Sequence, residues 1–265
     1  MVFSVFGVIK GMLNILFPKY CPGCRRVLDQ PDIMLCLLCR NDLPLTHYHR
    51  DNNQSFVHKF YGRLPLVQGT ALLHYHKKGL AQKLIHALKY RGQKDIGHWL
   101  GLWLGEELRV IPSYRGFSAV VPVPIHRKKL GLRGYNQAAI FARALAQSLE
   151  IPCLETLLIQ TEMRQTQAKQ GRWERWSKKH GFALNPEYFS LANSVFSGVQ
   201  ARTSKIHERI TKQEGHSQKP SSEDNNMSLL LVDDVITTGA TIEACGTILV
   251  HELGASLSCA SIAIA

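Results

Sequence analysis

The residues whose types and spacing best suit chemistry lie in segment 229–241, which reads LLLVDDVITTGAT. An apolar run, expected to form a buried strand, delivers the adjacent carboxylates Asp233 and Asp234 to its carboxyl end. A threonine-rich turn then opens an expected helix, and the N–H groups and dipole at a helix start favour an anion such as phosphate. Ligands of open α/β sheets bind at this edge. Carboxylates accept hydrogen bonds from sugar hydroxyls, so the segment suits a ribose 5-phosphate.

Two other interpretations of this segment are possible. An apolar strand ending in two aspartates also occurs as the second motif of P-loop nucleotidases, but those proteins need a G-x-x-x-x-G-K-[ST] loop, and the chain has none. Alternatively, Thr and Asp are common helix caps and the segment could simply start a helix. A cap explains one or two of these residues, not the whole string, so we favour the phosphosugar interpretation.

A basic run follows another expected strand. The sequence HRKK at 126–129, with Arg133 shortly after it, could stabilise the charge of a departing pyrophosphate. Two weaker candidates, Lys89 and Arg91, precede Gly92. The alternative is a solvated basic loop without a ligand. The pyrophosphate candidates are Arg91, Arg127, Lys128 and Arg133.

Four cysteines form two Cys-x-x-Cys pairs separated by eleven residues, a spacing typical of zinc sites. Four thiolates complete a tetrahedral shell, so the expected zinc would be structural. About thirty residues lack enough core to fold alone, and metal binding can supply that energy. The other three of the seven cysteines are scattered, which favours a reducing compartment and predicts a cytoplasmic protein. The expected ligands are Cys21, Cys24, Cys36 and Cys39.

Composition adds a bias towards anionic partners. The 265 residues carry 32 Lys+Arg against 20 Asp+Glu, a net charge of +12. Segment 163–180 is basic and holds Trp173 and Trp176, which suits either single-stranded nucleic acid or an amphipathic helix with its tryptophans in the core. Segment 1–17 is apolar at helical spacing, and we expect a short amphipathic helix. It lacks the features of a signal peptide, and no membrane span is predicted.

Expected strands and helices alternate along the rest of the chain, which predicts a mostly parallel sheet covered by helices on both faces. We divide the chain into a module over 1–60, whose last ten residues look like a linker, and a domain over 61–265, in which 197–227 is a flexible insertion. The expected strands are 69–76, 117–124, 153–160, 228–232 and 257–264. The expected helices are 79–109, broken at Gly92, 136–149 and 240–253.

Several motifs together resemble one family. Segment 229–241 resembles the phosphoribosyl pyrophosphate (PRPP) motif of type I phosphoribosyltransferases. The remaining motifs are similar to those of the ComF/GntX family, which is associated with competence and DNA utilisation. They are the Cys-x-x-Cys opening, IHALKYRG at 85–92, VPVP at 121–124, RGYNQ at 133–137, and Gln167-Ala168 followed by Arg172, Arg175, Trp176 and Gly181-Phe182.

The resemblance implies a type I phosphoribosyltransferase-like α/β fold that binds PRPP with a magnesium ion. It implies that the aspartates contact the ribose hydroxyls and that the turn holds the 5-phosphate. The residues concerned are Asp233, Asp234, Val235, Thr237, Thr238, Gly239, Ala240 and Thr241. Some relatives carry a further cysteine pair, but this chain has Asp51, Asn52 and Asn53 there, so no second metal is expected.

Three functional hypotheses follow. The first is a PRPP-binding protein of DNA uptake or utilisation, with single-stranded DNA and a DNA-uptake helicase as partners. The second is an active, magnesium-dependent phosphoribosyltransferase, for which the sequence names neither an acceptor nor a catalytic base. The third is a structural adaptor without affinity for PRPP.

Overall fold

The computed structural model describes residues 18–30, 32–50, 54–161, 181–187 and 227–265. The expected amphipathic helix over 1–17, the basic segment 163–180 and the expected insertion 197–227 lie outside these residues. Within them, no helix has both the length and the apolar character needed to cross a bilayer.

The centre of the fold is a four-stranded sheet in the order β1-β6-β5-β2, in which every neighbouring pair is parallel. A separate antiparallel pair joins two short strands, β3 and β4. The parallel strands are β1 (Leu66–His74), β2 (Ala119–Pro122), β5 (Ser228–Ile236) and β6 (Ser256–Ile264), and the short pair is β3 (Leu158–Gln160) and β4 (Phe182–Leu184). The expected α/β fold with a parallel sheet is confirmed.

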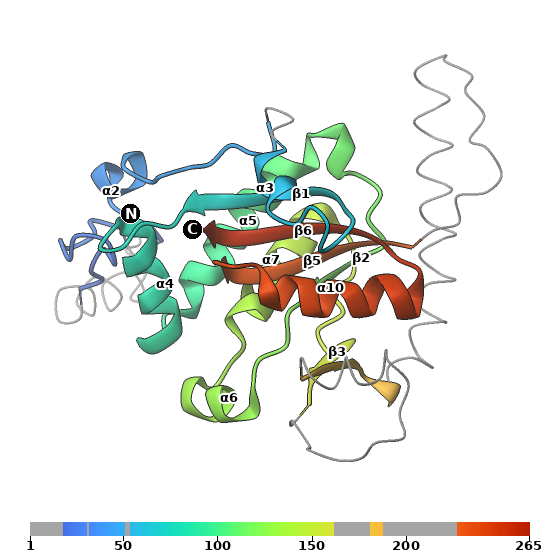
Figure 1. Cartoon of the computed structure of the whole chain (residues 1–265). Coiled ribbons are helices and arrows are strands. Elements are labelled where there is room, and N and C mark those ends of the chain that lie inside the picture. The colour runs from blue at the N-terminus through green and yellow to red at the C-terminus, as the bar shows by residue number, and fades with distance from the viewer. Residues whose placement is uncertain (1–17, 31, 51–53, 162–180, 188–226) are drawn as a thin grey trace, which may run out of the picture.

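Helices cover both faces of this sheet (Figure 1). The long helices are α4 (Leu80–Tyr90), α5 (Lys94–Arg109), α7 (Gln137–Leu149) and α10 (Ala240–Leu253). The short ones are α2 (Leu37–Asn41), α3 (Ser55–His58), α6 (Arg127–Arg133) and the 3-10 turn η1 (Pro112–Tyr114). Side chains alternate along β5: Leu230 and Val232 join the core with α4, α5 and α7, whereas Leu229 and Leu231 join the core with α3 and α10.

Helices α5 and α7 approach closely because glycines line the contact. A Cβ at Gly101 would stand 2.5 Å from the carbonyl oxygen of Phe141 and 2.7 Å from the Cβ of Ala144. No side chain fits there without moving the backbone of α7. The break between α4 and α5 falls at Gly92, as expected, where φ is +68°.

An antiparallel segment covers the outer edge of β1. Leu45 bridges Leu73, the Thr46 N–H donates to the Leu72 carbonyl oxygen at 3.1 Å, and the His74 N–H donates to Pro44 at 2.7 Å. Pairing of this kind protects an edge strand from pairing with other chains. It also fixes the residues that follow, 47–50, against β1.

Two local expectations are wrong. Segment 51–60 is not simply a linker, because its described part contains α3 and its Phe56 and Phe60 are fully buried. The basic run after β2 is not a loop but the short helix α6. His126 Nδ1 accepts from the Lys128 N–H at 3.1 Å at its start, and Gly134, with φ +74°, ends it.

Candidate functional site

A cleft of about 250 Å³ lies at the carboxyl ends of β2 and β5, near the lower end of the range for small-molecule sites. Carboxylates from β5 face cations from α4 and α6 across it. It is lined by Lys89, Val123, Pro124, Ile125, His126, Lys129, Arg133, Asn136, Gln137, Ala138, Gln160, Phe182, Asp233, Asp234, Val235 and Thr241. This composition suits a ligand with both hydroxyl and phosphate groups.

The two carboxylates have different surroundings. Lys89, in the last turn of α4, lies with its Nζ 2.8 Å from Asp234 Oδ2, and both side chains are largely buried. Asp233 Oδ1 accepts from the Asp234 N–H at 2.7 Å. Burial raises the pKa of Asp233 to about 7, with a further rise from the neighbouring charge of Asp234, despite that hydrogen bond and the nearby Lys89 and Lys129. Asp233 therefore changes charge near neutral pH.

The turn between β5 and α10 packs against the segment that follows α3. Gly239 has φ +79°, and a Cβ there would stand 2.6 Å from the ring of Phe60. Arg63 donates from Nη1 to the Thr238 carbonyl oxygen at 3.0 Å and from Nε to Glu243 Oε2 at 2.9 Å. These contacts could not be predicted from the sequence, because Phe60 and Arg63 lie far from the turn along the chain.

The predicted PRPP residues divide into two groups. Four of them line the cleft: Asp233, Asp234, Val235 and Thr241. The other four, Thr237, Thr238, Gly239 and Ala240, lie outside its lining and form the turn into the start of α10. The helix start thus lies beside the carboxylates, as an anion site next to a sugar site requires.

The pyrophosphate candidates are not brought together. Arg133 lines the cleft, donates to Gln137 Oε1 at 2.9 Å and stacks over the ring of Tyr90 with its guanidinium carbon 5.1 Å from the centroid. Arg127 and Lys128 are exposed on α6 outside the lining, and Arg91 lines a separate hollow. Lys129 and Lys89 occupy the cleft in their place.

Sequence reasoning assigned no role to several other lining residues. Asn136 caps α7 through the Ala138 N–H at 3.1 Å and donates to the Val123 carbonyl oxygen at 2.9 Å, which joins α7 to the end of β2. Gln160 and Phe182 come from β3 and β4. The available signals were the motifs RGYNQ at 133–137 and Gly181-Phe182, which were noted only for their resemblance.

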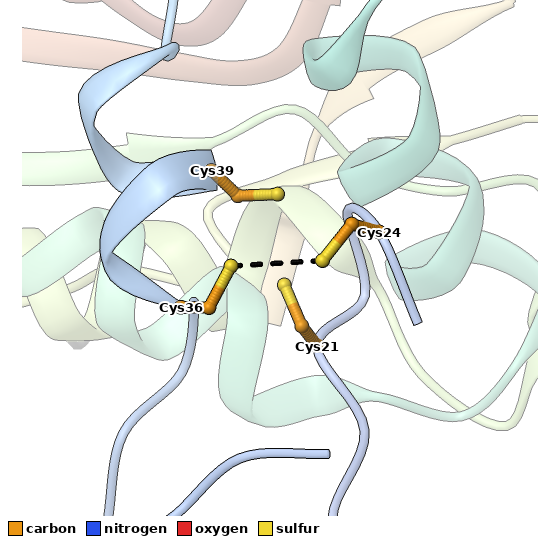
Figure 2. A group of neighbouring side chains, drawn as sticks. All are labelled: Cys21, Cys24, Cys36 and Cys39. Atoms are coloured by element: carbon orange, nitrogen blue, oxygen red, sulfur yellow. Dashed lines mark hydrogen bonds between the residues drawn. The ribbon is translucent and has the colours of Figure 1, made fainter. Parts of the chain in front are cut away.

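The four predicted cysteines converge in a second site (Figure 2). Cys21 and Cys24 lie on a tight turn flanked by the Tyr20–Val27 bridge, and Cys36 and Cys39 lie at the start of α2. All four Sγ atoms are within 4.8 Å of one another, and those of Cys24 and Cys36 are 3.6 Å apart. A tetrahedral ion with metal–sulfur bonds of about 2.3 Å separates its sulfurs by about 3.8 Å, so the cluster fits a metal ion.

The thiols of this cluster differ in acidity. Burial raises the pKa of Cys21, but backbone N–H groups of Cys36, Cys24 and Gly23 outweigh that effect and lower it to about 7. The pKa of Cys39 is raised by burial and by the neighbouring thiols. Once one thiol is ionised, its negative charge makes the neighbouring thiols harder to ionise. A bound cation would offset this repulsion and stabilise all four cysteines as thiolates.

A basic hollow of about 450 Å³ lies between the cysteine turn and α4. Arg25, Lys83, His86 and Arg91 line it, together with Pro22, Gly23, Cys24 and Gln82. Lys83 also donates to the Gly23 carbonyl oxygen at 3.2 Å, which ties α4 to the cysteine turn. No carboxylate is among the lining residues, so the hollow suits an anionic group.

These features define a parallel α/β protein with a charged cleft at the strand ends and a four-cysteine cluster that can hold a metal ion. The chain is similar to the competence protein F of Haemophilus influenzae, with 26% identity over 248 residues, 92% of this chain and 90% of that protein. This similarity covers most of both chains and supports the resemblance to the ComF family. No family model matches the chain.

Proposed function

We propose that the protein binds PRPP in the cleft at the end of β5, as a phosphoribosyltransferase-like protein of DNA uptake or utilisation. The observation that carries this proposal is that Asp233, Asp234, Lys129 and Arg133 line one cleft beside the start of α10. The competence role rests on the similarity to competence protein F.

Each part of PRPP has a partner in this arrangement. The ribose hydroxyls donate to Asp233 and Asp234, and the 5-phosphate accepts from the turn into α10. The pyrophosphate lies against Arg133 and Lys129, since Arg and Lys are the usual donors to phosphate oxygens. Mg²⁺, when bound, would neutralise pyrophosphate charge and be held largely by the ligand's own oxygens.

The four-cysteine cluster holds zinc in this proposal. Zinc is the ion that four thiolates at this spacing bind most often, and the closed shell makes the site structural. Cys21 and Cys39 are buried in the same core as α4 and α5, so the metal would fix the cysteine segment to the domain. We also place the protein in the cytoplasm, where its thiols stay reduced.

The test of PRPP binding is isothermal calorimetry with Mg²⁺ on the full chain and on an Asp233→Asn/Asp234→Asn double variant. Because both substituted groups line the cleft, we expect the variant to lose most of the PRPP affinity. Asp95→Asn, an exposed carboxylate on α5, is the control and should bind like the wild type. A folded wild type that shows no heat of binding would contradict the proposal.

An active phosphoribosyltransferase is the alternative within the same site. Asp233, with its pKa near 7, could accept a proton from an acceptor at neutral pH. Release of pyrophosphate with a panel of bases and amines would favour this alternative. PRPP binding without pyrophosphate release would favour the binding protein.

Single-stranded DNA is the proposed partner of the basic hollow. The hollow is lined by cationic side chains and no carboxylate, so it can bind the negatively charged phosphates of a DNA backbone. Fluorescence anisotropy with a labelled oligonucleotide should show weaker binding for Lys83→Ala/Arg91→Ala than for Lys78→Ala, an exposed lysine outside the hollow. Equal affinities would remove the hollow as the DNA site and leave the helicase as the partner to examine.

A further inference from the structure

Three ligand-type side chains meet between the edge of the sheet and α5. His47 and His49 directly follow the segment that covers β1, and Glu107 lies near the end of α5. One ligand atom from each residue lies within 4.8 Å of the other two. None of the three belongs to the cleft, the cysteine cluster or the basic hollow.

These same side chains hold buried polar atoms without hydrogen-bond partners. Among the described residues, the buried side-chain nitrogen and oxygen atoms in this condition are His47 Nδ1, His49 Nε2 and Glu107 Oε2. His49 Nε2 and Glu107 Oε2 are 2.6 Å apart, the distance of an ion pair if the histidine is protonated, but they do not form a hydrogen bond. Native proteins rarely leave such atoms unsatisfied, and each costs about 1–3 kcal/mol. Three such atoms on residues whose ligand atoms lie within 4.8 Å of one another suit a shared cation.

The second polar atoms of His49 and Glu107 have partners that orient the two side chains. His49 Nδ1 lies 3.2 Å from Thr70 Oγ1 on β1. Glu107 Oε1 accepts from Trp103 Nε1 at 2.8 Å and pairs with Arg50 Nη2 at 3.0 Å. Metal-binding histidines and carboxylates are usually held by such outer hydrogen bonds.

We propose that His47 Nδ1, His49 Nε2 and Glu107 Oε2 bind a divalent transition-metal ion such as Zn²⁺. Imidazole and carboxylate ligands suit this class of ion, and three protein ligands leave one position for water. Bonds of about 2.1 Å separate tetrahedral ligand atoms by about 3.4 Å, so the His49–Glu107 contact opens by less than an ångström.

The site would fasten segment 44–50 to α5. Trp103 connects it to the cysteine segment, because the Arg40 guanidinium lies over the Trp103 ring, with its carbon 5.5 Å from the centroid. The four cysteines would hold the first part of the N-terminal segment, and zinc at this second site would hold its last part, residues 47–50. Under this proposal the chain holds a second metal without a second cysteine pair, which the sequence did not lead us to expect.

The test is a Co²⁺ titration of the full-length, reduced and metal-free chain, followed by optical spectroscopy. Cobalt bound by cysteine gives intense thiolate charge-transfer absorption, whereas cobalt bound by His and Glu gives weak bands without it. The wild type should bind about two equivalents, of which one adds thiolate absorption. His47→Ala and Glu107→Gln should bind about one equivalent, and it should keep the full thiolate signal.

The matched control is His98→Ala, which removes an exposed histidine from α5 and should still bind about two equivalents. The retained thiolate signal shows that each variant is folded. His47 is only partly buried, so His47→Ala decides the matter if Glu107→Gln does not fold. A wild type that binds a single equivalent, or a His47→Ala chain that still binds two, would overturn the proposal.

Discussion

At the scale of single residues, the cleft is governed by which of its adjacent carboxylates carries charge. Lys89 pairs with Asp234, whereas Asp233 is partly buried beside this negative neighbour, and both effects raise its pKa to about 7. A bound sugar hydroxyl is a better donor to a carboxylate than to a carboxylic acid. PRPP affinity should therefore include a contribution from Asp233 that grows as the pH rises through about 7.

The same group affects stability in the opposite direction. Folding raises the pKa of Asp233 from 3.8 to about 7. The protonated side chain therefore contributes its full stabilisation below pH 3.8, and this contribution is lost as the pH rises through about 7. Between about pH 5 and pH 8 the free energy of unfolding should fall by up to about 3 kcal/mol from this source. Urea unfolding followed by circular dichroism should show this pH dependence in the wild type and a smaller one in Asp233→Asn.

The control for that measurement is Asp95→Asn, which should keep the wild-type dependence on pH. If Asp233→Asn and the wild type lost the same free energy between the two pH values, the assignment to Asp233 would be wrong.

At the scale of elements, the turn between β5 and α10 depends on the segment that follows α3, far from the turn along the chain. Gly239→Ala introduces a Cβ at φ +79° and against the ring of Phe60. We expect a loss of about 2–4 kcal/mol, from backbone strain together with overpacking. Gly116→Ala is the matched control: its φ is +85° but nothing lies within 4 Å of the added Cβ, so it should lose only about 1 kcal/mol.

A double-mutant cycle with Phe60→Leu separates the two causes. If the ring causes the clash, the smaller side chain should relieve part of the cost of Gly239→Ala, with a coupling of at least about 0.5 kcal/mol. Additive effects would mean that strain in the backbone explains the whole loss and that Phe60 does not brace the turn.

Much of this architecture was predictable because its signals are local. The strand, turn and helix over 228–253 follow from an apolar run, two aspartates and a glycine, and the structure places them nearly as expected. The Cys-x-x-Cys pairs likewise carry their geometry in their spacing. Helix α6 was missed because Leu130 and Leu132 remain exposed on it, so it shows no buried face.

Other features could not be read from the sequence because they depend on contacts between distant segments. Phe60 lies in a polar stretch and gains its role only where it meets Gly239. His47, His49 and Glu107 meet because segment 44–46 pairs with β1 and because α5 packs beside that edge. Neither spacing nor composition links a histidine pair to a glutamate in a later helix.

At the scale of the whole molecule, the cysteine cluster is part of the main core. Cys39→Ser removes one of its four thiols, so we expect the thermal midpoint of a single transition to fall by roughly 10 °C. Cys153→Ser, outside the cluster and partly buried, should lower it less. Scanning calorimetry that showed a separate low-temperature transition, with the main one unchanged, would contradict this and indicate an independent module.

The strand order has a consequence for how the chain acquires its fold during synthesis. Strand β6 pairs with both β1 and β5, yet it follows every other described strand in the sequence. Strand β1 therefore has no partner within the parallel sheet until residues 256–264 have left the ribosome, and among the described residues its earlier backbone partner is segment 44–46. Such long-range pairing folds slowly and exposes apolar strands meanwhile. The nascent chain should accordingly depend on chaperones until β6 has emerged and paired with β1 and β5.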